Sequence, residues 1–285
     1  MKTKQQQRIE LVCDYISQHL DEPLSLETLS EVACCSKYHF HRLFVAGVGL
    51  SVTKYAQLAR LKRASFRLAF EHQLKIIDVA LEAQFDSPEA FSRAFKRTFT
   101  QSPSEFRSKP NWPNWHTQFE FSLPDKKVCP MNVNIVDFKA QPVALLTHQG
   151  AANTLMNTAA QFIEWRKESG FSPVKTSNTY GIPYSDPATT EDDAFRFDFA
   201  GSITSPITEN PQGVRNGEIP AGRCAVVRHN GSHDTISDTV YYLYREWLVQ
   251  SGEEVRDFPC FFHYLNLIHE VDECDLQTDI YLPIK

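Results

Sequence analysis

The chain has 285 residues, of which 42% are hydrophobic, and carries a formal net charge of −6; at about 150 residues per domain, this length predicts two domains. No stretch approaches the roughly 18 uncharged apolar residues of a membrane helix, and the N-terminal residues lack the apolar core of a signal peptide. The seven cysteines form no Cys-x-x-Cys pair, which argues against a disulfide framework and a zinc site. We therefore expect a cytoplasmic protein with no membrane contact, no metal and no cofactor.

Charge divides the chain unevenly. Residues 1–109 have a net charge of +4 and residues 110–285 a net charge of −10, so one half is suited to a polyanion and the other is not. The segment 108–132 contains four prolines and no helical period, which is typical of a linker. Apolar residues recur at helical spacing before this segment and alternate as in strands after it. We expect domains at 1–108 and 131–285, joined by a linker at 109–130.

Two segments of the first half repeat one pattern, residues 24–44 and residues 74–95. Each predicts a short amphipathic helix that ends in alanine (Ala33, Ala83), a tight turn, and a second helix that begins after a serine. Ser36 and Ser87 are suited to cap these second helices, and Leu24 and Leu29 are spaced to form a hydrophobic staple on the first one. Each second helix carries Phe-x-Arg-x-Phe, as Phe40-x-Arg42-x-Phe44 and Phe91-x-Arg93-x-Phe95.

Helical spacing predicts which side of each second helix is buried. Phe40, Leu43 and Phe44 form one apolar stripe, and Phe91, Ala94 and Phe95 form the other. The opposite sides carry an arginine and hydrogen-bonding groups, which suits insertion into a DNA major groove, where arginine binds guanine with two hydrogen bonds. Any solvated helix shows polar groups outward, but the repetition of the arginine favours DNA contact. The candidate DNA-binding residues are Ser36, Lys37, Tyr38, His41, Arg42, Ser87, Glu89, Ser92, Arg93, Lys96 and Arg97, and we expect Arg60, Lys62, Arg63, Lys96 and Arg97 to meet phosphates.

Residues 8–107 resemble the DNA-binding domain of the AraC/XylS family of transcription regulators. The resemblance is carried by "ARLKRA" at 59–64 and by "IIDVALEAQFDSPEAFSRAFKRTFTQSPSEFR" at 76–107. It implies a seven-helix unit whose two recognition helices enter successive major grooves of double-stranded DNA, and RNA polymerase as a further partner. Gln84 stands where the family usually has glycine, and a left-handed conformation there would cost about 1 kcal/mol.

The second half contains its own repeat: "ALLTHQG" at 144–150 and "AVVRHNG" at 225–231. Each copy precedes a helix pattern and two strand-like runs, and the offset between the copies is 81 residues at the strand and 82 at the helix end. Strand–helix–strand–strand, twice, predicts pseudo-two-fold symmetry with a groove at the seam. His148 and His229 end equivalent strands, and we expect each to hydrogen-bond locally because no further ligand has zinc-like spacing.

Residues 131–285 resemble the GyrI-like small-molecule-binding domain, through "YGIPYSDP", "FRFDF", "IPAGRCAVVRHNGSHD", "YREWLVQSG" and "DIYLPIK". The fold class implied is therefore multidomain α and α+β: an all-α double helix-turn-helix domain followed by a tandem strand-helix-strand-strand domain. Phe262 stands where the family usually carries a glutamate that pairs with cationic ligands, so we expect a neutral aromatic or apolar effector, with cation–π contact from Phe262 as the weaker alternative. The candidate groove residues are Trp165, Tyr180, Trp247, Phe262 and Tyr264, although the two tryptophans also suit the core.

Three functions are compatible with these observations. The first is a sequence-specific DNA-binding transcription regulator that a small apolar or aromatic effector modulates. The second is an effector-independent regulator whose C-terminal domain binds a protein partner, and the third is a GyrI-like hydrolase. The hydrolase needs a glutamate that Phe262 replaces, so we expect no enzyme. Whether the groove is open or filled by its own side chains distinguishes the first function from the second.

Overall fold

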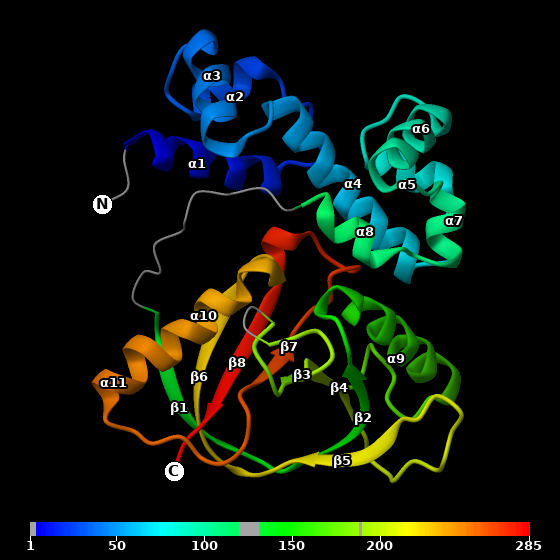
Figure 1. The fold of residues 1–285 in the computed structure, drawn as a ribbon, viewed down its shortest axis with the longest axis vertical. Coiled ribbons are helices and arrows are strands. Elements are labelled where there is room, and N and C mark those ends of the chain that lie inside the picture. The colour runs from blue at the N-terminus through cyan, green and yellow to red at the C-terminus, as the bar shows by residue number, and fades with distance from the viewer. Residues whose placement is uncertain (1–3, 120–130, 188–189) are drawn as a thin grey trace. The chain divides into compact units, whose positions relative to one another are not determined.

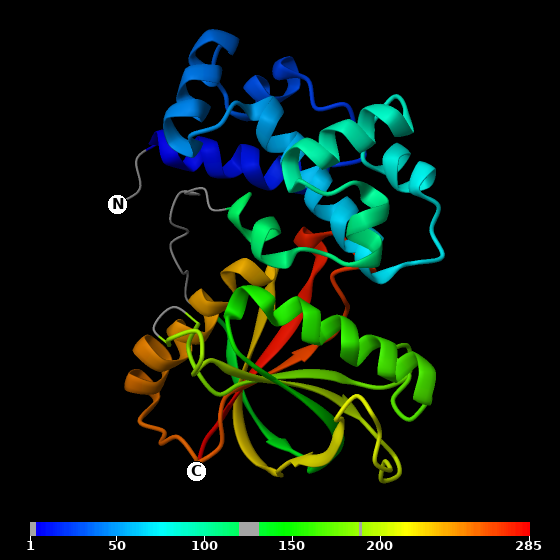
Figure 2. The same ribbon diagram turned by 45° about the vertical axis from the view of Figure 1, so that its right-hand side comes forward.

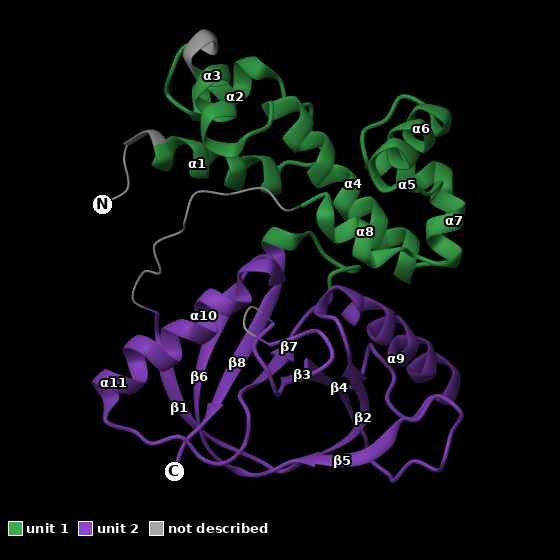
Figure 3. Cartoon of the chain, viewed as in Figure 1, with its two compact units in different colours: residues 1–127, 268–274 green, residues 128–267, 275–285 purple. Residues whose placement is uncertain are grey.

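A computed structural model describes residues 4–119, 131–187 and 190–285, without the side chains of residues 4, 5 and 37–39. The chain forms two compact units, which Figure 3 shows in green and purple. The first unit comprises residues 1–127 and 268–274, and the second comprises residues 128–267 and 275–285. The segment 268–274 thus belongs to the helical unit although the strands on either side of it in the chain belong to the other. No pattern in the sequence indicates this assignment.

The described part of the first unit is helical (Figure 1). Two helix pairs, α2–α3 and α5–α6, are joined by the 19-residue helix α4, which is buried along most of its length because it supports both pairs. The bounds are α1 (Lys4–Gln18), α2 (Leu26–Val32), α3 (Lys37–Val48), α4 (Val52–Phe70), α5 (Ile76–Glu82), α6 (Pro88–Phe99), α7 (Pro103–Ser108) and α8 (Trp112–Thr117).

The helix starts follow the predicted signals with one exception. Ser25 caps α2 by accepting from the Thr28 amide at 3.0 Å, and Leu24 and Leu29 pack in one apolar cluster, which confirms the staple. Ser87 caps α6 by accepting from the Ala90 amide at 3.1 Å. Ser36 occupies the equivalent place before α3, but its side chain makes no capping hydrogen bond. The prediction that the Ser36 hydroxyl caps its helix is therefore wrong.

The turns between the paired helices are alike. Gln84 follows α5 with φ of +59°, as predicted, and Cys34 follows α2 with φ of +50°. In each pair the next amide closes the turn: Cys35 N–H donates to the Ser30 carbonyl and Phe85 N–H to the Ala80 carbonyl, both at 3.1 Å. Both turns thus place a residue with a Cβ atom in the left-handed region, where glycine has no steric penalty.

The segment predicted as a linker contains a helix. Residues 112–117 form α8, in which Trp112 and Trp115 are buried. The Trp115 indole donates to Ser65 Oγ at 2.7 Å, so α8 is anchored to α4. Pro113 lies in the first turn, where its missing N–H costs nothing. The prediction that 109–119 is irregular is therefore wrong, and residues 120–130 of the predicted linker lie outside the described residues.

The second unit is built on an eight-stranded sheet in which every strand pair is antiparallel. Its order, β1-β6-β8-β7-β3-β4-β2-β5, is symmetric about the β7–β3 pair, and Figure 2 shows that the sheet curls. Helix α9 packs on β2 and β4, and α10 packs on β6. The strands are β1 (Val133–Phe138), β2 (Gln141–Gln149), β3 (Thr179–Pro183), β4 (Arg196–Ser202), β5 (Arg215–Ile219), β6 (Gly222–Asn230), β7 (Phe261–Tyr264) and β8 (Gln277–Pro283); the helices are α9 (Leu155–Ser169), α10 (Ile236–Tyr242) and α11 (Leu248–Ser251).

The expected repeat of strand–helix–strand–strand is confirmed, as β2–α9–β3–β4 and β6–α10–α11–β7–β8. The two helical segments differ in one respect. Helix α9 is regular, whereas α10 and α11 are joined by a π-helical turn at Leu243–Trp247. A π-helical turn accommodates one inserted residue in an α-helix, which accounts for the change of offset from 81 to 82 residues between the copies.

We predict that Gln84→Gly stabilises the helical unit by about 0.5–1 kcal/mol, because glycine has no steric penalty in the left-handed region. The gain is reduced by the greater conformational entropy of glycine in the unfolded chain. The denaturant midpoint of unfolding measures this. Gln84→Ala is the matched control: it keeps a Cβ atom and should leave the midpoint unchanged. An equal gain from both variants would show that the backbone conformation is not the cause.

Candidate DNA-contacting and ligand-binding sites

Helix α3 presents the predicted polar side to solvent. Phe40 and Phe44 are buried at 1% and 0% exposure, Leu43 is half-buried, and His41 and Arg42 are exposed. Ser36 is also exposed. Within the part of the chain that the structure describes, Arg42 makes no hydrogen bond or ion pair, so its guanidinium is available to a ligand. The side chains of Lys37 and Tyr38 lie outside the described residues.

Helix α6 repeats this arrangement. Phe91, Ala94 and Phe95 are buried, whereas Glu89, Arg93, Lys96 and Arg97 are exposed and Ser92 is half-buried. Arg93 corresponds to Arg42 in the repeat and likewise has no partner among the described side chains. The half-buried Ser87 caps the helix with its hydroxyl. Glu89 lies in the first turn, where a carboxylate favours the helix dipole.

The three residues of α4 that were expected to meet phosphates have partners inside the helical unit instead; they are Arg60, Lys62 and Arg63. Arg60 donates from Nε to the Leu20 carbonyl at 2.9 Å and from Nη2 to the Glu22 carbonyl at 2.6 Å. It therefore joins α4 to the loop after α1. These internal hydrogen bonds favour a structural role for Arg60 over the expected phosphate contact, which stays a prediction.

Lys62 and Arg63 are neutralised by carboxylates from distant parts of the chain. Lys62 Nζ lies 2.9 Å from Glu273 Oε1, and its side chain is 9% exposed. Arg63 pairs with Asp21 and with Asp272, the latter at 3.0 Å. These internal ion pairs likewise favour a structural role over the expected phosphate contacts, which stay predictions. No motif in the sequence indicates that Asp272 and Glu273 pair with these two cations.

The predicted groove residues fall into three separate apolar clusters. Phe262, at 6% exposure, packs with Phe195, Phe197 and Leu243, and Tyr264 and Trp247 pack against the same cluster. Tyr180 belongs to a second cluster with Val143 and Phe261, and Trp165 to a third with Phe162. The structure therefore brings together three of the five candidates and separates Trp165 and Tyr180 from them.

The register explains why Tyr180 is separated. Tyr180 is opposite His263 on β7, and Gly181 is opposite Phe262. Directly opposed residues share a sheet face, so Tyr180 shares the face of His263, their rings 4.8 Å apart. Phe262 and Tyr264 lie on the other face. The expectation that Tyr180 shares one groove wall with Phe262 is wrong.

Aromatic rings occupy the seam between the two halves of the sheet. A methyl group added at Gly181 would come within 2.5 Å of Phe197 Cζ and 2.6 Å of the Tyr264 hydroxyl. These two rings therefore lie directly against the Gly181 backbone, at the β3–β7 pair where the halves meet. Burial raises the pKa of the Tyr264 hydroxyl, which therefore stays protonated, and the two rings occupy the space over Gly181.

The two histidines of the repeat have the same local partners, as expected. His148 Nδ1 lies 2.8 Å from Thr158 Oγ1 and its Nε2 3.3 Å from the Ala151 carbonyl. His229 Nδ1 lies 2.8 Å from Thr239 Oγ1 and its Nε2 3.0 Å from the Ser232 carbonyl. Since a carbonyl only accepts, Nε2 carries a proton in both rings, and Nδ1 and the threonine hydroxyl form the second hydrogen bond. Among the described residues, no group of three or more His, Cys, Asp or Glu side chains could hold a metal ion.

Comparison with known proteins identifies both halves. Residues 131–285 match the GyrI-like small molecule binding domain, and residues 29–109 match a helix-turn-helix domain. The first match covers more than half of the chain. The chain belongs to the GyrI-like family. Both resemblances seen in the sequence are thereby confirmed: this GyrI-like chain carries an AraC-type helix-turn-helix domain ahead of its small-molecule-binding domain.

Three curated relatives of this GyrI-like chain are informative. It is 50% identical over 154 residues to the "Probable transcriptional regulator YgiV" of Escherichia coli K12, covering 54% of this chain and 96% of that protein. It is 34% identical over 118 residues to the "Right origin-binding protein" of Escherichia coli K12, covering 40% of each. It is 28% identical over 184 residues to the "Transcriptional regulator Rob" of Salmonella typhimurium, covering 63% of this chain and 62% of that one.

The described residues contain no helix long and apolar enough to cross a bilayer.

Basic residues of α4 and α6 should respond differently to mutation. We predict that Lys96→Ala reduces the salt dependence of DNA binding by about one unit of slope, because an exposed lysine that meets a phosphate releases a counterion. Arg60→Ala should leave that slope unchanged and lower the melting temperature, because its hydrogen bonds are internal. Binding isotherms at several salt concentrations measure the slopes. A reduced slope for Arg60→Ala would contradict the structural role of Arg60.

Proposed function

We propose that the protein is a transcription regulator that binds specific double-stranded DNA through α3 and α6. The observation that carries this proposal is the repeated placement of Arg42 and Arg93. Each is exposed, lies on the side opposite a buried phenylalanine pair, and has no partner among the described side chains. Because arginine binds the O6 and N7 atoms of guanine with two hydrogen bonds, two such residues on two helices suit two adjacent major grooves.

The remaining DNA-contact candidates support the same interface. His41, Glu89, Lys96 and Arg97 are exposed and Ser92 is half-buried, so each is accessible from solvent on α3 or α6. We assign Lys96 and Arg97 to phosphates and the others to the edges of bases. Lys37, Tyr38, Ser36 and Ser87 remain candidates from the sequence. Relatives named as transcriptional regulators favour RNA polymerase as a second partner and the cytoplasm as the place of action.

We also propose that a small apolar or aromatic effector binds the GyrI-like domain near Phe262. Phe262, Tyr264 and Trp247 are in or against one apolar cluster beside the π-helical turn. This apolar cluster, with Phe262 where the family usually carries a glutamate, favours a neutral guest, because a buried cation needs a carboxylate to offset its desolvation. Trp165 and Tyr180 belong to other clusters and are not part of this proposal. Since Phe262 replaces the glutamate expected for a hydrolase, we propose no catalytic role.

One observation favours a second candidate function for the same domain. The Phe197 and Tyr264 rings lie against Gly181 at the seam, so an effector there has to displace them. A regulator that works without an effector, and whose C-terminal domain binds a protein partner, requires no such movement. Measurable binding of a small ligand to the intact chain separates the two.

Removing either repeated arginine tests the DNA interface. We predict that Arg42→Ala and Arg93→Ala each reduce discrimination between the operator and random DNA by about 1–3 kcal/mol, because each removes a base contact. Competition binding against random duplex measures the discrimination. Lys75→Ala, an exposed residue outside α3 and α6, is the control. An equal loss on both DNAs would show that the arginines contact only the backbone.

Restoring a carboxylate at position 262 tests the ligand preference. We predict that Phe262→Glu makes the protein respond to a lipophilic cation such as tetraphenylphosphonium, which should raise its melting temperature by offsetting a buried charge. Phe262→Gln has a side chain of the same shape as glutamate but without the charge, and its melting temperature should not respond to the cation. If the cation stabilises the unaltered chain as much as Phe262→Glu, the assigned role of Phe262 fails.

A further inference from the structure

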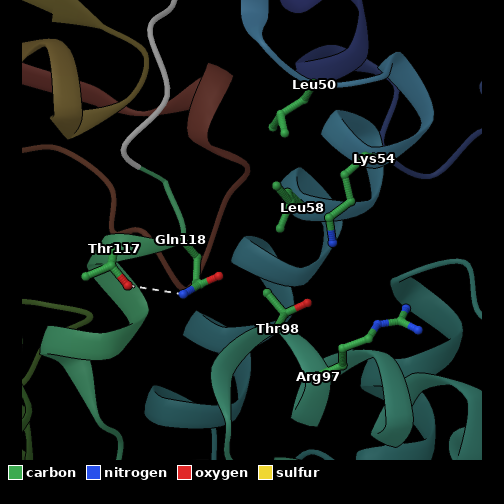
Figure 4. A pocket seen from close by; sticks show the side chains of 7 residues that line it. All are labelled: Leu50, Lys54, Leu58, Arg97, Thr98, Thr117 and Gln118. Atoms are coloured by element: carbon green, nitrogen blue, oxygen red, sulfur yellow. Dashed lines mark hydrogen bonds between the residues drawn. The ribbon is translucent and has the colours of Figure 1, made fainter.

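A pocket of about 320 Å³ lies within the helical unit, between α4, α6 and the end of α8. Its volume is at the lower end of the range for small-molecule sites. Figure 4 shows Lys54 and Leu58 on α4 and Leu50 in the connection before it. It also shows Arg97 and Thr98 on α6, and Thr117 and Gln118 at the end of α8. The lining consists of Leu50, Lys54, Leu58, Arg97, Thr98, Thr117 and Gln118.

The charge of this pocket is not compensated. Lys54 and Arg97 are its two ionisable residues, and the lining contains no carboxylate. Within the described part of the chain, neither cation makes an ion pair or a side-chain hydrogen bond. Burial, and then the positive charge of Arg97, lower the pKa of Lys54. The two cations therefore repel each other, and an anion between them would relieve the repulsion.

The other side of the pocket is apolar and is not needed for an inorganic ion. Leu58 is buried at 5% exposure and Leu50 is half-buried. Phosphate or chloride would use the cations and leave these leucines without a partner. A molecule with an anionic head and a hydrocarbon body uses both sides, and the buried Thr98 and the Gln118 amide offer it further hydrogen-bonding groups.

We propose that this pocket binds a small organic anion, a carboxylate with a short aliphatic or aromatic body. Lys54 and Arg97 contact the carboxylate, and Leu50 and Leu58 contact the hydrocarbon. This site is separate from the effector site near Phe262, and its occupancy does not depend on the proposed function. Arg97 also lies on the exposed side of α6, so the anion competes with a DNA phosphate for the same guanidinium.

The test is calorimetric binding of 4-phenylbutanoate to the intact chain at low salt without DNA. The neutral analogue 4-phenylbutanamide has the same shape and should bind at least about tenfold more weakly, because hydrogen bonds to charged groups are the stronger ones. Lys54→Met and Arg97→Gln should each weaken 4-phenylbutanoate about tenfold or more. Lys75→Met, remote in sequence from the lining, should bind as the unaltered chain does.

These variants are expected to fold, because Lys54 has no ion pair to lose and methionine fills the same volume at a half-buried position; an unchanged melting temperature checks this. The proposal is overturned if 4-phenylbutanoate does not bind, or if the amide binds equally well. It is also overturned if both variants keep full affinity for the carboxylate. If Lys54→Met weakens DNA binding and 4-phenylbutanoate binds neither the unaltered chain nor this variant, the proposal is also overturned, and Lys54 contacts the DNA backbone instead.

Discussion

The burial of two phenylalanines on each recognition helix fixes what those helices can present. Phe40 and Phe44 on α3, and Phe91 and Phe95 on α6, are at most 1% exposed. Residues four apart share a helix face, so the residue between them, Arg42 or Arg93, has to lie on the other side. Burying one phenylalanine contributes about 1.5–3 kcal/mol, more than an exposed arginine contributes to folding. The core therefore sets the rotation of each helix, and with it the side on which Arg42 and Arg93 are exposed.

In the second unit the two copies of the repeat share the hydrogen bonds of their histidines. They differ in the residues around Phe262, where a ligand site is expected. His148 and His229 have matching threonine and carbonyl partners, whereas Gly181 faces Phe262 across the β3–β7 pair. Two large residues could not both stand there, because Phe197 and Tyr264 already occupy the space over Gly181. The π-helical turn adds a second difference, since only one copy contains it. The two halves have thus diverged in the residues around Phe262 and Trp247.

Much of this could be predicted because it depends on local spacing. The buried stripes on α3 and α6 and the order of strands and helices follow from periodicity. The left-handed Gln84 follows from the resemblance to a family that usually has glycine there. The partners of Arg60, Lys62 and Arg63 could not be predicted, because they depend on carbonyls and carboxylates that only the folded chain brings near. That Tyr180 lies on the sheet face opposite Phe262 could not be predicted, because alternation within one strand does not give its register with β7. The helix α8 was missed because its prolines resemble those of a linker.

The segment 268–274 has a consequence for how the helical half can be studied. It belongs to the first unit and brings Asp272 to Arg63 and Glu273 to Lys62. A recombinant fragment that stops after α8 would lack both carboxylates. Lys62, whose side chain is 9% exposed, would then lose an anion that offsets its desolvation. The DNA-binding half of this chain thus includes acidic residues that follow α8 by some 150 positions. Truncation at the apparent domain boundary removes the ion pairs that these residues form with α4.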